Sequence, residues 1–350
     1  MTQVARRSLT KGRGSCFGML RRCQSMGLHN VYIKCRLFDT VVKPVLLYGC
    51  EVWGPAVLKR GCFRGSGFVT EMEKFHRGFL KSCLGVRKSV PDSVVMLELR
   101  RQPLALCMLK QLLGFAERVW AREGDDVVRL AMQESFGLAQ KGIRQCWAAQ
   151  LIGCLGAHGV VSREGDVVCG GSCVDLGSLH DQWVRSLAVD VLPMTIRSIP
   201  DSERVGFKVR KYTNWFADAA CDVCDTFWYQ LSSPREITAV ARFRMASHNL
   251  NVEKQRFTGR SGAGRSGRVC VCCSLGEVED ELHVLTCPLY SDVVESHKLV
   301  FERELPIANE DVRMNFFMNR SDGPTAFWRC MASFLRVCDN KRSKYFDSLA

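Results

Sequence analysis

The sequence lacks the features that would place it in a membrane or outside the cell. No run of about 18 apolar residues occurs, which excludes the usual form of a membrane-spanning helix. The N-terminus is basic and polar, with no apolar stretch leading to a small-residue cleavage site of the secretory type. We therefore expect an intracellular protein, in the nucleus or the cytoplasm, with no membrane partner.

Acidic residues are absent from residues 1–38, where Lys and Arg recur. The chain carries a formal net charge of +13, and a second basic stretch covers residues 242–268. Clustered positive charge favours a polyanionic partner, most simply RNA or DNA. The alternative is a basic surface without a specific partner.

A disulfide framework is not indicated, although the chain has 19 cysteines. Several of them stand singly in apolar patterns, as Cys35, Cys50 and Cys83 do, where a free cysteine behaves as a small hydrophobic residue. Together with the missing secretory signal, this pattern predicts a reducing environment.

One segment concentrates cysteine and histidine at the spacing of a metal site. Its residues form a C-x2-C-x9-H-x3-C array of Cys270, Cys273, His283 and Cys287. Three thiolates and an imidazole complete the tetrahedral shell that structural zinc prefers, so no position is left open for catalysis. Cys272 competes with Cys273 but stands too close to Cys270. The alternative interpretation is a set of buried cysteines beside a surface histidine.

Acidic residues directly precede the histidine of this array. One of them can accept a hydrogen bond from the imidazole, or all of them can form the solvated start of a helix. The residues concerned are Glu279, Asp280 and Glu281.

Apolar periodicity predicts a mainly α fold. One helix is expected near 71–84, with acids in its first turn and Gly85 at its end. Further helices are expected over 91–122, from Pro234 with Ser233 as N-cap, and over 324–338. We divide the chain into a helical region at 1–125, a variable region of helices and loops at 126–205, and a helical domain at 206–350. The last contains the cysteine motif, at about 268–290.

Four blocks in order resemble the reverse transcriptases of LINE-type (non-LTR) retrotransposons. LFDTVVKPVLLYGCEVWG at residues 37–54 resembles the segment after the polymerase palm, and EKFHRGFLKSCLGV at 73–86 resembles the helix that follows it. RFRMASHNLNVE at 242–253 and EDELHVLTCPLY at 279–290 are similar to the region of the C-terminal zinc knuckle. The resemblance implies a thumb-like helical region followed by a helical domain with a CCHC zinc knuckle.

The residues that the family's polymerase chemistry requires are not found. Its palm holds two Mg²⁺ ions on an aromatic-Ala-Asp-Asp turn and a further aspartate. Here Phe216-Ala217-Asp218 continues with Ala219, and Asp125-Asp126 follows a charged loop. We expect a truncated fragment of an RNA-directed DNA polymerase, without the palm that would bind Mg²⁺ and inactive alone.

The resemblance also implies RNA or DNA as partner, and an intact polymerase of the same element is a further candidate. The expected phosphate contacts are Arg21, Arg22, Lys34, Arg36, Lys43, Arg77, Lys81, Arg242, Arg244, Arg256, Arg260, Arg265 and Arg268. For each of them, a solvated helix face is the competing interpretation. His76, with Arg77 and Lys81, is expected on a polar face of its helix, whereas Tyr48 and Trp53 are expected in the core.

A different class of function stays open beside this one. The chain can equally be a stand-alone zinc-containing module that binds another protein and has no polymerase role. Nothing in the sequence indicates an oligomeric state.

Overall fold

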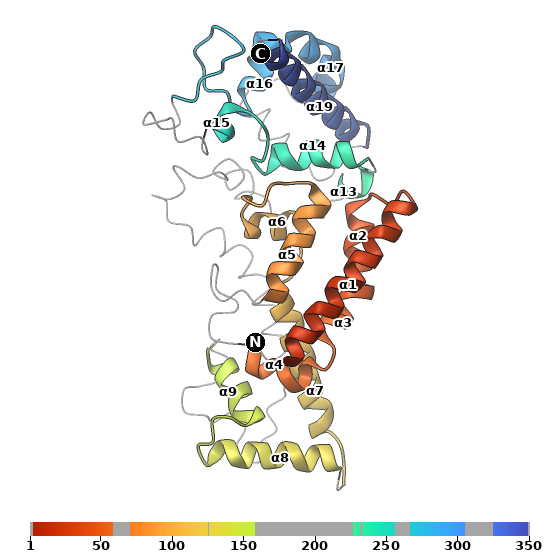
Figure 1. Ribbon diagram of the computed structural model, residues 1–350, viewed down its shortest axis with the longest axis vertical. Helices are drawn as coiled ribbons and strands as arrows, with labels where there is room; N and C mark the ends of the chain where they lie inside the picture. Colours follow the sequence, from red (N-terminus) through yellow and green to blue (C-terminus); the bar gives the residue numbers. More distant parts are fainter. Residues whose placement is uncertain are drawn as a thin grey trace. The chain divides into compact units, whose positions relative to one another are not determined.

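The computed structural model describes residues 3–58, 71–124, 126–157, 227–231, 233–255, 267–304 and 325–348. These residues form helices joined by loops, and their only β-structure is an isolated bridge between Val269 and Val278 (Figure 1). The prediction of a mainly α protein is confirmed. None of the helices in the described ranges combines the length and the apolar character that a membrane crossing requires.

The chain forms two compact units, each built from separate segments. The first contains Met1–Arg22, Leu37–Gly78 and Arg100–Ser198. Its elements are α1 (Gln3–Ser25), the π-helix η1 (Phe38–Val42), α3 (Lys43–Leu47), α4 (Cys50–Val57), α7 (Leu104–Trp120), α8 (Val127–Gln140) and α9 (Trp147–Ala157). Helix α5 (Glu71–Leu84) contributes residues to both units, as α1 does.

Helix α1 buries one face and exposes the rest. Ala5, Leu9, Cys16 and Met19 recur at three, four or seven residues and are buried, which is the spacing of a single helix face. Gly12 lies on the same face, where a Cβ atom would stand 2.3 Å from Leu46 Cδ2. Glycine therefore permits the close approach of α1 to α3.

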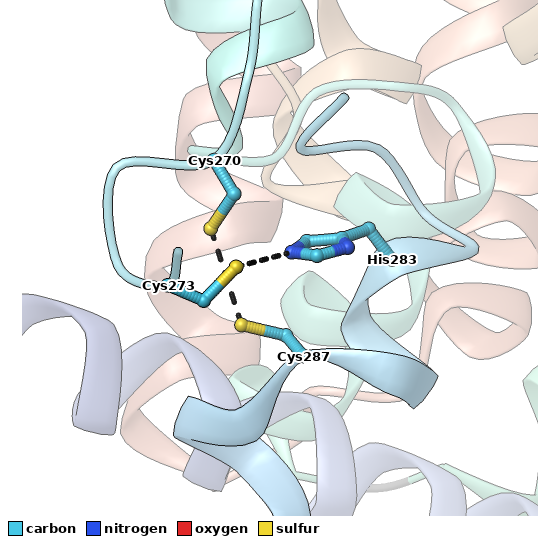
Figure 2. Close-up of side chains that lie close together, drawn as sticks. All are labelled: Cys270, Cys273, His283 and Cys287. Atoms are coloured by element: carbon cyan, nitrogen blue, oxygen red, sulfur yellow. Dashed lines mark hydrogen bonds between the residues drawn. The ribbon is translucent and has the colours of Figure 1, made fainter. Parts of the chain in front are cut away.

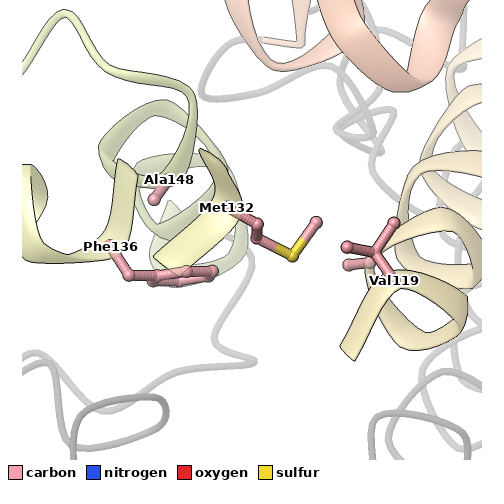
Figure 3. Packing of buried hydrophobic residues seen from close by; sticks show 5 residues of the cluster. Val119, Met132, Phe136 and Ala148 are labelled. Carbon is pink, nitrogen blue, oxygen red and sulfur yellow. The ribbon is translucent and has the colours of Figure 1, made fainter. Parts of the chain in front are cut away.

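A small apolar core joins α7, α8 and α9 (Figure 3). Val119 of α7, Met132 and Phe136 of α8, and Ala148 of α9 belong to one cluster, and all four are buried. The indole N–H of Trp147 donates to the carbonyl oxygen of Glu51 at 2.8 Å, which ties α9 to α4. Part of the region predicted as variable is thus a packed part of the first unit.

Helix α5 occurs where the sequence predicts it, but His76 does not lie on an exposed polar face. Its side chain is 0% exposed and stacks on Phe38, with ring centroids 5.1 Å apart. Nδ1 lies 3.6 Å from Oε1 of the buried Glu73, whose Oε2 accepts a hydrogen bond from the Leu104 amide at 2.7 Å. Burial lowers the pKa of His76, and Glu73 opposes that shift only in part.

The prediction for the aromatic pair holds for one member only. Trp53 is buried, as expected, and its indole N–H donates to the Tyr48 carbonyl at 3.1 Å. Tyr48 itself is 81% exposed, so its assignment to the core is wrong. Tyr48 ends α3 with an extended backbone just before Gly49, whose φ of +66° turns the chain into α4, and this turn leaves the tyrosine ring outside.

The second unit contains Cys23–Arg36, Phe79–Leu99 and Ile199–Ala350. Its elements are α2 (Val31–Leu37), α6 (Asp92–Glu98), α13 (Phe227–Gln230), α14 (Pro234–Arg244), α15 (Asn251–Lys254), α16 (His283–Thr286), the 3-10 helix η2 (Pro288–Tyr290), α17 (Ser291–Glu304) and α19 (Thr325–Asp347). Helix α19 packs against α14 and α17. Helix α14 begins at Pro234 as predicted, although the Ser233 side chain makes no capping hydrogen bond.

Candidate metal centre

A short hairpin-like turn presents the first two cysteines of the motif. Val269 and Val278 form an antiparallel bridge, and the Cys270 amide donates to the Glu277 carbonyl at 2.7 Å. Cys270 and Cys273 lie in the loop that this pairing closes. The Cys272 amide donates to Cys270 Sγ at 3.3 Å, so the loop curls around that sulfur atom.

A single helical turn presents the other two ligands. The Asp280 carboxylate accepts hydrogen bonds from the amides of Leu282 and His283 at 2.9 and 3.2 Å, and it thereby starts α16. At the other end of the turn, the Cys287 amide donates to the His283 carbonyl at 2.8 Å. The x3 spacing therefore brings an imidazole and a thiol to the same side.

The four side chains converge on one point (Figure 2). Ligand atoms of Cys270, Cys273, His283 and Cys287 all lie within 4.8 Å of one another. Cys270 Sγ is 3.9 Å from Cys287 Sγ, and Cys273 Sγ is 3.4 Å from His283 Nε2. A tetrahedral shell with metal–sulfur bonds of about 2.3 Å and metal–nitrogen bonds of about 2.0 Å has sulfur–sulfur edges of roughly 3.8 Å and sulfur–nitrogen edges of roughly 3.5 Å. The arrangement therefore fits a tetrahedral metal ion.

Cys272 forms a poorer alternative. It lies near Cys270 and the Glu279 carboxylate, which together offer three ligand atoms. Glu279, however, is committed to other partners: it accepts hydrogen bonds from Arg342 Nε at 2.6 Å and from the Asn251 amide at 2.8 Å. The set with Cys273 and His283 offers four ligands and is the better centre.

Two thiols at this site, those of Cys270 and Cys287, have raised pKa values. Burial raises the pKa of Cys287, and the nearby thiols of Cys270 and Cys273 raise it further. Burial likewise raises the pKa of Cys270, to which Glu279 and Cys273 add. Thiolates packed this closely repel one another, so a divalent cation is what would allow the thiols to ionise together.

The acid that orients the imidazole is Glu277, which the sequence did not single out. Its Oε2 lies 2.8 Å from His283 Nδ1, so Nδ1–H donates to the carboxylate and Nε2 is left toward Cys273. The three acids expected in this role act elsewhere. Glu281 pairs with His248 at 2.9 Å, and Asp280 and Glu279 make the contacts given above.

Three of the seven predicted nucleic-acid contacts of the first half are exposed, and the other four are half-buried. Arg21, Arg22 and Arg36 are exposed, and Lys34 is half-buried. Lys43 pairs with Asp39 at 2.9 Å. On α5, Arg77 Nε lies 3.6 Å from Glu73 Oε1, and Lys81 pairs with Asp92 at 2.6 Å, so each of these cations has an acidic neighbour.

The predicted contacts of the second half are divided. Arg244 is only 4% exposed, and its Nε donates to the buried Glu98 carboxylate at 2.6 Å. It is therefore not available to a phosphate group, and we withdraw that assignment. Arg268 is half-buried and donates to the Val252 carbonyl at 2.7 Å. Arg256, Arg260 and Arg265 lie outside the described residues.

Comparison with protein-family models, with curated protein sequences and with solved structures finds no match for this chain. The resemblance to LINE-type reverse transcriptases therefore rests on the four sequence blocks alone. The geometry of the Cys3His cluster stands independently of that resemblance.

Proposed function

We propose that this chain is a nucleic-acid-binding, zinc-stabilised part of a LINE-type retrotransposon reverse transcriptase and does not polymerise by itself. The observation that carries the nucleic-acid role is the exposed face of α1. That helix contains no Asp or Glu, and its six cations all lie on exposed positions: Arg6, Arg7, Lys11, Arg13, Arg21 and Arg22.

The positively charged face of α1 is long enough to contact several phosphate groups of a duplex. From Arg6 to Arg22 the helix rises about 24 Å, a length that spans roughly seven base pairs of a duplex. In the described part of the chain, Arg7, Lys11 and Arg21 make no ion pair with a carboxylate that would neutralise them. Such cations supply affinity and salt dependence without reading sequence.

Zinc is the metal that the ligand chemistry favours. Three thiolates and one imidazole at tetrahedral spacing are typical of structural zinc, whereas Mg²⁺ requires oxygen ligands. Four protein ligands leave no position for a substrate, so the ion would stabilise the fold of residues 267–290. Zinc binding would then contribute directly to the folding free energy of this segment.

The structural role of Asp126 supports the proposal that the chain does not polymerise by itself. Asp126 is the N-cap of α8 and accepts hydrogen bonds from the amides of Val128 and Arg129 at 3.0 and 3.1 Å. This role occupies the one carboxylate of the 125–126 pair that the structure describes. Asp218 lies outside the described residues.

A salt series tests the proposed function. Binding of the purified zinc-loaded chain to a labelled structured RNA and to a labelled DNA duplex is measured by fluorescence anisotropy from low to high salt. We expect binding that weakens steeply with salt, and a Lys11→Glu/Arg21→Glu variant should lower the slope of log K against log salt by roughly two.

The matched control is Lys110→Glu/Arg118→Glu on α7, which reverses two exposed cations of the same unit. It changes the net charge equally and should leave the slope within about half a unit of the wild-type value. Equal losses in both variants, or no binding at low salt, would overturn the proposal.

A further inference from the structure

A pocket lies between α14 and α19 in the second unit. Its volume of about 800 Å³ is within the range of ligand-binding sites. Arg235 and Arg242 of α14 line one wall, and Arg336 of α19 lines the other. Val284 and Tyr290, on either side of the candidate metal ligand Cys287, also line it. We call this pocket the α14–α19 groove.

The groove carries an excess of positive charge. Arg235 and Arg336 are exposed, and Arg242 is half-exposed with its Nε donating to the Gly85 carbonyl at 3.0 Å. Among the described residues, none of these three arginines pairs with a carboxylate. The one acid in the lining, Asp339, accepts a hydrogen bond from the Asn249 side chain at 3.2 Å.

The groove exposes apolar surface but no aromatic face. Val337 lines it and is 36% exposed, whereas the lining residues Phe243 and Tyr290 are only 6% and 1% exposed. Leu250 and Leu335 also line it, at 6% and 7% exposure. Proteins that bind single-stranded nucleic acid stack bases on accessible aromatic rings, and this groove has none. Apolar contacts below a rim of arginines instead suit a peptide that carries both apolar side chains and carboxylates.

We propose that the α14–α19 groove binds a short acidic, amphipathic segment of a partner protein. The apolar side chains of the segment pack on Val337 and on the accessible edges of Leu250 and Leu335, and its carboxylates pair with Arg235, Arg242 and Arg336. Because Val284 lies between the ligands His283 and Cys287, the metal centre shapes one wall. The groove contains no residue of α1, so this interaction is separate from the proposed contact with nucleic acid.

A random 12-residue peptide library displayed on phage tests the groove on the full zinc-loaded chain. We expect selected peptides enriched in Asp or Glu together with Leu, Ile or Phe. The selected peptide is then synthesised with a fluorescent label, and its affinity is measured by anisotropy. The Arg235→Glu/Arg336→Glu variant reverses two exposed cations of the rim and should weaken binding about tenfold or more.

Lys110→Glu/Arg118→Glu again serves as the control with an equal change of net charge, and it should alter the affinity less than about twofold. Equal weakening by both variants would overturn the proposal, as would selected peptides without an excess of acidic residues. A labelled oligouridine that binds the wild type and is lost in Arg235→Glu/Arg336→Glu would also overturn it, in favour of a nucleic-acid groove. Chelation of the metal should abolish binding of the peptide, since Val284 and Tyr290 would lose their places.

Discussion

At the scale of single residues, substitutions can distinguish the candidate ligands Cys273 and His283 from the neighbouring Cys272. Replacing either ligand by Ala leaves an incomplete shell, so we expect the purified variant to lose most of its bound zinc. The amides of residues 267–290 should then exchange with solvent faster, because metal binding stabilises this segment. Zinc content by elemental analysis and hydrogen exchange by mass spectrometry measure the two effects.

Cys272→Ala is the matched control because Cys272 lies in the same loop and belongs only to the poorer alternative site. This variant should keep one zinc ion per chain. Undiminished zinc in both Cys273→Ala and His283→Ala would contradict the ligand assignment. Loss of zinc from Cys272→Ala alone would favour the alternative set.

A second prediction at this scale concerns pH and His76. Burial holds the pKa of this imidazole below its ordinary value of about 6.5, and Glu73 opposes the shift only in part. Below pH 6.5 the unfolded chain therefore takes up a proton that the folded chain does not. Stability is present in full above pH 6.5 and falls as the pH is lowered, by up to about 1.4 kcal/mol per pH unit.

Between about pH 6.5 and 5, the contribution of His76 to stability can be measured separately from that of its acidic neighbours. Charged partners hold the pKa of Glu73 and of Asp39 below their usual values despite burial, so their losses begin at lower pH. Hydrogen exchange of α5 amides should show the fall in the wild type, and a His76→Leu variant should lack it. The same pH dependence in both proteins would contradict the prediction.

At the scale of elements, a buried ion pair links α6 to α14. Arg244 and Glu98 are 4% and 0% exposed, and Arg244 also lies over the Trp328 ring of α19, with 5.9 Å between the guanidinium carbon and the ring centroid. Arg244→Met keeps much of the packing but leaves the Glu98 carboxylate buried without its partner. We expect a loss of about 3–5 kcal/mol in the free energy of unfolding.

Urea titration measures this loss, and a second substitution identifies its cause. Glu98→Gln added to Arg244→Met removes the stranded charge and should restore most of the stability. If the double variant is no more stable than Arg244→Met, the loss comes from packing and not from the buried charge.

The helices that the sequence predicts well are those with local start and stop signals. Helix α5 begins at Glu71, with acids in its first turn, and it ends at Leu84 before Gly85, whose φ is +65°. Helix α1, by contrast, begins at Gln3 with no acid in its first turn, and Gly12 lies within its first half. Tertiary packing, such as the close approach of Gly12 to Leu46, stabilises this part of the helix. A local sequence pattern contains no information about such packing.

The four residues of the candidate metal centre are predictable from their spacing, whereas the residues that support them are not. Four ligands lie within one short segment, so the C-x2-C-x9-H-x3-C pattern contains the whole shell. Glu277 contacts His283 only because the bridge at Val269 and Val278 folds the loop back. Arg244 was counted as a surface cation because its partner Glu98 is distant in sequence.

At the scale of the whole molecule, the chain does not fold as consecutive blocks. Each of the two units takes segments from the first hundred residues and from later ones. A division by sequence order follows changes in composition, and composition does not reveal which distant segments pack together. Segments such as 79–99 therefore pack with residues beyond 227, as the contacts of Gly85 with Arg242 and of Glu98 with Arg244 show.

The pair between Glu279 and Arg342 has a consequence for the order of events during synthesis. The two residues stand 63 positions apart, and all four candidate metal ligands leave the ribosome well before Arg342 does. An ion can thus be captured while the Glu279 carboxylate is still hydrated. Docking of α19 then buries that carboxylate beside a loop that is already closed around the ion. Without zinc, this loop would not be folded when α19 is synthesised, and α19 would lack the surface on which it packs.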